Sequence, residues 1–76
     1  MEKERKDKLI GLLSSTNPED WGIADALIVH TDGESLKEVC EVMKKKKAVI
    51  EIHLHSREIV IEYFKVMEKL QEACLN

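Results

Sequence analysis

Apolar residues recur every three or four positions along most of the chain, which is the spacing of one face of an α-helix. Ser56 is suited to cap the first turn of the last such segment. The pattern therefore predicts a C-terminal helix whose apolar face is broader than one helical hairpin needs to bury. Its main stripe consists of Ile59, Tyr63, Val66, Met67, Leu70 and Cys74.

Two further helices are predicted in the first third of the chain. The first spans residues 2–13, with charged residues in its opening turns and apolar residues from Leu9 to Leu13. Pro18 suits the first position of the second helix, because its missing N–H would have no helical partner there. Short polar side chains that can cap this helix precede it, at Ser15, Thr16 and Asn17. Its apolar face is expected to contain Trp21, Ala24, Leu27 and Ile28.

The stretch LIGLLSSTNPEDWGIADALI, within roughly residues 9–29, resembles the first hairpin of HEAT-like helical repeats. In that pattern an LL-S turn is followed by a polar N-P-E-D cap and a helix of small residues. The resemblance implies an αα-hairpin, whose surface in such families usually binds other proteins. No second copy with the same period follows, and arrays of this kind need about three units, so a solenoid is excluded.

The middle of the chain allows two interpretations. Gly33 is expected to end the second helix in a left-handed conformation, and Ser35–Glu38 to form a capping box that starts a third. The end of this third helix is left open, because Lys44–Lys47 suits either a helix terminus or a helix interior. In the following AVIEIHLH, the alternation of apolar and polar residues favours a half-buried strand over 48–54, although helical spacing also fits.

Two folds are consistent with these elements. The first is a mainly α protein, a small helical bundle that opens with an αα-hairpin and in which 48–54 is either a short strand or part of a helix. The alternative is an α/β fold with a β-α-β core, in which strands near 26–31 and 48–54 flank a crossover helix. A sheet this short has only marginal stability on its own. Either interpretation that includes a strand therefore predicts a dimer. In both folds residues 1–76 form a single small domain.

The composition narrows the class of protein. A hydrophobic share of 43% and a charged share of 36% indicate a folded domain with a heavily charged surface. A core of this size leaves only about 3–5 kcal/mol of net stability, which favours a protein partner. The net charge of −3 argues against a nucleic acid as the main partner. The apolar run at Leu9–Leu13 is too short for a membrane span or a secretory signal, which predicts a cytoplasmic protein.

Few residues have the spacing of a chemical site. Cys40 and Cys74 fit no metal-ligand motif and are too few for a disulfide scaffold, so we interpret them as separate buried thiols in a reducing compartment. His53 and His55 would share one face of a strand and could chelate zinc, but no third ligand is fixed by a motif. A solvated polar face is therefore favoured, and neither a metal nor another cofactor is predicted.

Lys44, Lys45, Lys46 and Lys47 are the alternative site, for nucleic-acid phosphates. Consecutive lysines on a helix point in different directions and do not make one patch. The sequence also contains no Gly-rich phosphate loop, nucleophile elbow or HExxH motif. A chain of 76 residues is also too short to enclose a pocket easily, and both observations argue against an enzyme.

These observations favour a small protein–protein interaction module that forms a homodimer and acts as a regulator, adaptor or inhibitor of another protein. The candidate partner-binding residues lie on the wide C-terminal face, at Tyr63, Val66, Met67 and Leu70. Trp21 is added to them as a hot-spot candidate, although a core position between the first two helices is favoured for it.

Overall fold

The protein is an all-helical bundle in the part of the chain that the structure describes. A computed structural model describes the backbone of residues 2–75 and the side chains of residues 3–46 and 48–74. Within residues 2–75 there is no strand, which confirms the prediction of a mainly α bundle. The helices are α1 (Glu2–Leu13), α2 (Pro18–Val29), α3 (Gly33–Ile52) and α4 (Arg57–Leu75).

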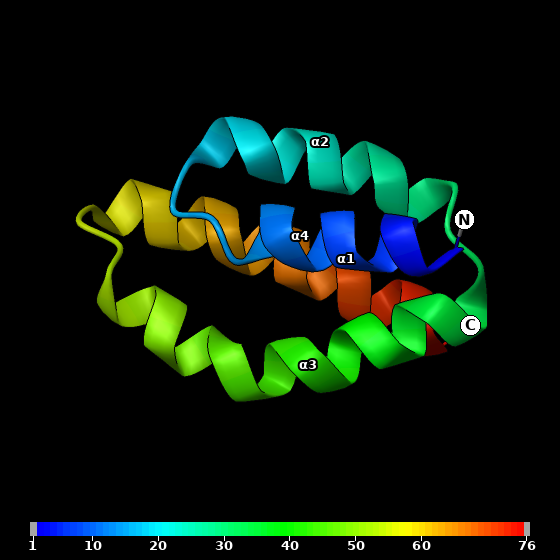
Figure 1. The fold of residues 1–76 in the computed structure, drawn as a ribbon. Coiled ribbons are helices and arrows are strands. Elements are labelled where there is room, and N and C mark those ends of the chain that lie inside the picture. The colour runs from blue at the N-terminus through cyan, green and yellow to red at the C-terminus, as the bar shows by residue number, and fades with distance from the viewer. Residues whose placement is uncertain (1, 76) are drawn as a thin grey trace.

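The bundle consists of two antiparallel hairpins, α1–α2 and α3–α4, packed on each other (Figure 1). Helix α1 packs against α3, and α2 packs against α4, and each of these two pairs runs in the same direction. The α1–α2 and α3–α4 turns lie at one end of the bundle, which we call the turn end (Figure 1). The α2–α3 connection lies at the opposite end, together with the two chain termini.

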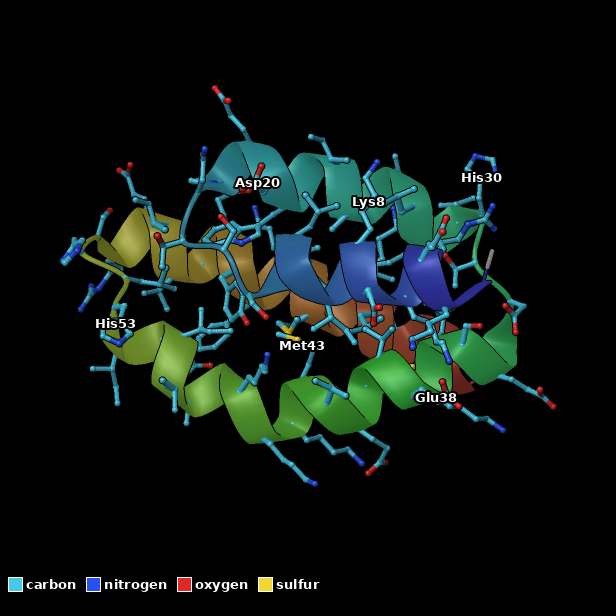
Figure 2. The ribbon with its side chains drawn as sticks, viewed as in Figure 1. Lys8, Asp20, His30, Glu38, Met43 and His53 are labelled. Carbon is cyan, nitrogen blue, oxygen red and sulfur yellow. A yellow bond between two sulfur atoms is a disulfide. The ribbon has the colours of Figure 1, made fainter. Side chains whose placement is uncertain are left out.

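The core draws apolar side chains from all four helices. Helix α4 packs on both α2 and α3, so its wide apolar face is buried within a single chain. Figure 2 shows Met43 pointing from α3 into the interior of the bundle. The buried apolar residues are Leu9, Leu13, Trp21, Ala24, Ile28, Leu36, Val39, Met43, Ile50, Tyr63, Val66, Met67 and Leu70.

The predicted strand at 48–54 is wrong, because α3 continues through the lysine run to Ile52. Ile50 is buried, Ile52 is 78% exposed and Leu54 is half-buried, whereas a strand would place all three on one face. Residues 26–31 likewise form the end of α2 and the following turn, so the β-α-β alternative is also wrong. The segment is helical and not a strand because, on a helix, Ile50 extends the buried stripe of Leu36, Val39 and Met43.

The start of α2 is as predicted, but the start of α3 is not. Asn17 caps α2, with its Oδ1 accepting a bond from the Glu19 N–H at 3.1 Å, and Pro18 opens the helix. Helix α3 begins at Gly33, whose φ is negative, and its cap is Asp32 instead of Ser35. The carboxylate is the better cap because the amide end of a helix favours negative charge.

The Asp32 cap leads to a testable stability effect. Its Oδ2 accepts a bond from the Ser35 N–H at 3.1 Å, and its Oδ1 accepts one from the Ser35 hydroxyl at 2.7 Å. Asp32→Ala removes both acceptors and should lower the free energy of unfolding by about 1 kcal/mol in urea titrations. Asp32→Asn retains an acceptor and should cost clearly less. Equal stability of Asp32→Ala and the wild type would contradict Asp32 as the cap.

Candidate interaction surface

The five residues predicted to bind a partner all lie in the core of the monomer. Tyr63, Met67 and Leu70 project from α4 between α2 and α3, and Val66 and Trp21 are also buried. Their role in binding remains a prediction, and in the folded monomer each exposes less than a tenth of its surface. The core position favoured for Trp21 is the one observed.

Trp21 and Tyr63 form an aromatic pair between α2 and α4 near the turn end. Their ring centroids are 5.0 Å apart, and the ring planes are inclined by 54°. The Trp21 Nε1–H donates a hydrogen bond to the Ser15 carbonyl oxygen at 2.9 Å. The pair therefore joins the α1–α2 turn to the first half of α4.

The Tyr63 hydroxyl has no comparable partner. The residue is fully buried, and no described group lies within hydrogen-bonding distance and angle of the hydroxyl oxygen. Burial, and to a smaller extent the negative charge of Glu51, raises the pKa of Tyr63 from 10.0 to about 12. An unpaired buried hydroxyl lowers stability, and ionising it would lower stability further.

Four large apolar side chains on the helix ends that flank the α3–α4 turn are exposed. Two belong to the last turn of α3, where Val49 is 57% and Ile52 is 78% exposed. Two belong to the first turns of α4, where Ile61 is 47% and Phe64 is 43% exposed. We call Val49, Ile52, Ile61 and Phe64 the turn-end patch. Sequence periodicity missed it because Ile52 and Ile61 lie outside the core stripes of their helices.

Charged residues of both signs lie near this patch, and Glu62 on α4 lies 3.6 Å from Lys65 of the same helix. Lys45 and Lys46 are exposed on α3, and Glu58 and Glu62 are exposed on α4. Lys44 lies 3.2 Å from Glu41, a solvated pair one turn apart on the same helix. Lys44, Lys45 and Lys46 are successive residues of α3, so their side chains point in different directions around the helix. The side chain of Lys47 lies outside the described residues.

The two histidines at the turn end, His53 and His55, are both exposed. His53 terminates α3, where its N–H donates to the Ile50 carbonyl oxygen at 3.0 Å, and its side chain is exposed (Figure 2). His55 is exposed in the α3–α4 turn. Among the described side chains, no group of three His, Cys, Asp or Glu is arranged to hold a metal ion.

Two open cavities lie between helices. One, of about 320 Å³, lies between α2 and α4 and is bordered by an ion pair in which Lys69 Nζ is 2.8 Å from Asp25 Oδ1. The other, which we call the α3–α4 cavity, is about 200 Å³. It is lined by Cys40, Met43, Lys44, Met67, Leu70 and Gln71.

A disulfide joins Cys40 in the first half of α3 to Cys74 in the last turn of α4. Their interpretation as two separate thiols is therefore wrong. The antiparallel hairpin brings the two positions to the same level, although 34 residues separate them in the chain. Cys40 lines the α3–α4 cavity, and Cys74 is not among the described residues that line it.

Comparisons with family models, with curated proteins and with solved structures found no match to this chain. The HEAT-like resemblance therefore rests on the quoted residues alone, and its structural implication, an αα-hairpin, is present as α1–α2. Among the described residues, no helix is long and apolar enough to cross a membrane.

Proposed function

We propose that the protein is a non-catalytic protein–protein interaction module that self-associates through the turn-end patch and regulates, recruits or inhibits another protein. The observation that carries the proposal is the exposure of Val49, Ile52, Ile61 and Phe64 around one turn. Large apolar side chains gathered on the surface of a small soluble domain mark an interaction site. The patch replaces the buried face of α4 as the surface through which association takes place.

A second copy of the chain suits this patch because the α3–α4 hairpin is antiparallel. A two-fold axis beside the patch brings α3 of one copy against α4 of the other. The exposed Lys45 and Lys46 then approach the acidic side of the other copy, formed by Glu58 and Glu62. Each attraction occurs twice, and it favours this arrangement over one in which like helices meet.

The size of the chain sets how much surface such a dimer uses. A stable interface buries about 800 Å² on each partner, which is roughly a sixth of the 5283 Å² surface of the monomer. The four patch residues are its apolar centre, and neighbouring residues of α3 and α4 form its polar rim.

Lysine substitutions in the patch test the proposal without disturbing the core. Ile52→Lys and Ile61→Lys each place an ammonium group at the centre of the interface, where it loses water without gaining a partner. We expect the concentration at which dimers dissociate to rise by at least about tenfold, measured by light scattering over a dilution series. Circular dichroism should show unchanged helix content, because both positions are exposed.

Ile23→Lys is the matched control. Ile23 is also a large exposed apolar residue, 49% accessible, but it lies on α2 outside the patch. This variant should dimerise like the wild type. A wild-type chain that stays monomeric at every concentration would refute self-association. A dimer weakened equally by Ile23→Lys and Ile52→Lys would refute the turn-end patch as its interface.

A further inference from the structure

We infer that Cys40 and Cys74 form a thiol–disulfide exchange site for small anionic thiols of the glutathione class, in which Cys40 is the sulfur attacked. This inference is independent of the proposed self-association. It rests on the asymmetry between the two sulfurs, on the charge beside one of them and on an acceptor beside the other.

The asymmetry is one of access. Cys40 borders the open α3–α4 cavity, so a thiolate of a small molecule can approach its Sγ from that side. Cys74 lies in the last turn of α4 and is not among the described residues that line this cavity. Thiolates attack a disulfide at the sulfur that they can reach, and the other sulfur leaves.

The charge beside Cys40 is that of Lys44. The two residues are four apart on α3, so they lie on the same helix face, and both line the cavity. Lys44 is held only by its exposed contact with Glu41, a kind of pair that contributes little. Its ammonium group can therefore attract an anionic thiol and stabilise a thiolate at Cys40.

The leaving sulfur also has a suitable environment. Cys74 Sγ lies 3.2 Å from the Leu36 carbonyl oxygen, and Cys40 Sγ lies 3.8 Å from the Leu70 carbonyl oxygen. In the disulfide neither sulfur carries a hydrogen. After reduction each thiol has a carbonyl acceptor in place, so the bundle accommodates the reduced pair without an unpaired donor.

The exchange proceeds in two balanced steps. A thiolate attacks Cys40 Sγ, a mixed disulfide forms at Cys40, and the Cys40–Cys74 bond breaks to release Cys74 as a thiolate, which takes a proton from water. A second small thiolate then attacks the small-molecule sulfur of the mixed disulfide. The low-molecular-weight disulfide forms, and the Cys40 thiolate leaves and is protonated. Two electrons pass from the two small thiols to the protein, and reversal of both steps restores the bond.

The inference predicts where glutathione attaches. Oxidised full-length protein is treated with reduced glutathione under native conditions, quenched with acid and analysed by peptide mass spectrometry. We expect the mixed disulfide at Cys40 in at least about tenfold excess over Cys74, because only Cys40 is reached from the cavity. Equal attachment at the two cysteines, or resistance of the bond until the protein is denatured, would overturn the inference.

Two pairs of variants distinguish the effect of the Lys44 charge from the effect of access to the Cys40 sulfur. Cys74→Ser, which retains Cys40, should react with glutathione disulfide at least about tenfold faster than Cys40→Ser. In the oxidised wild-type background, Lys44→Gln should slow reduction by glutathione several-fold, and added salt should reduce this difference. Lys8→Gln removes an exposed charge on α1 that is not among the described residues lining the cavity, and it should leave the rate unchanged. Equal rates for the two lysine variants would overturn the role of Lys44.

Discussion

Replacing Trp21 by alanine is expected to leave most of the protein unfolded at room temperature. Trp21 is buried, packs against Tyr63 in a tilted arrangement with ring centroids 5.0 Å apart, and donates a hydrogen bond to the Ser15 carbonyl oxygen. Loss of a buried aromatic side chain of this size costs about 3–5 kcal/mol. That cost equals the whole net stability expected of a domain of this length, about 3–5 kcal/mol.

Trp21→Phe is the control that separates apolar packing from the hydrogen bond. Phenylalanine retains a ring against Tyr63 but leaves the Ser15 carbonyl without its donor, at a cost of about 1–2 kcal/mol. Urea titration followed by circular dichroism measures both variants, since neither retains the tryptophan fluorophore. An alanine variant within about 1 kcal/mol of the wild type would show that Trp21 does not anchor the α1–α2 turn to α4.

The second large effect is expected in alkali and comes from Tyr63. Its pKa in the folded chain is about 12, against 10.0 for an ordinary tyrosine. The folded state therefore holds the phenolic proton more tightly than the unfolded state does. The contribution to stability is complete below pH 10 and is lost as the pH rises from 10 towards 12, by at most about 3 kcal/mol.

The measurement can be made specific because Tyr63 is the only tyrosine. Ultraviolet titration of tyrosinate should give a midpoint near 12 in the folded protein and near 10.0 in urea. Tyr63→Phe removes the alkaline loss of stability that is due to this residue. At neutral pH it should leave stability unchanged or raise it by up to about 1 kcal/mol, because the hydroxyl it deletes has no described partner. A folded-state midpoint near 10.0 would contradict the burial of the hydroxyl.

The residues with strong local preferences were the ones whose structure could be predicted. Asn17 and Pro18 define the start of α2 by capping and by a missing N–H, which depend only on neighbours in the chain. The apolar stripe of α4 could likewise be predicted from spacing within that one segment. The stretch 48–54 could not be assigned, because its β-branched residues satisfy both the two-residue and the helical period. Only the burial of Ile50 in the core decides between them.

The candidate interaction surface was harder to predict, because the spacing of apolar residues does not show what covers them. An apolar stripe indicates that a helix face is buried, but it does not say whether the covering helix belongs to the same chain. The face containing Tyr63 and Leu70 is covered by α2 and α3 of its own chain. The Cys40–Cys74 bond joins positions 34 residues apart, so no local pattern could reveal it. The turn-end patch depends on residues such as Ile52 that interrupt the periodic pattern.

The pairing of the bundle as two hairpins has a consequence for the order of folding. Each hairpin is completed by contacts between helices that are adjacent in the chain, so both can form rapidly from local collisions. The parallel contacts of α1 with α3 and of α2 with α4 form only when the hairpins dock. Among the described side chains, the two ion pairs that join different helices, Lys6–Glu38 and Asp25–Lys69, cross this junction. Docking is therefore the step that joins residues of one hairpin to residues of the other. The α1–α2 hairpin, which is synthesised before α3 and α4, lacks most of its core contacts until α4 has been made.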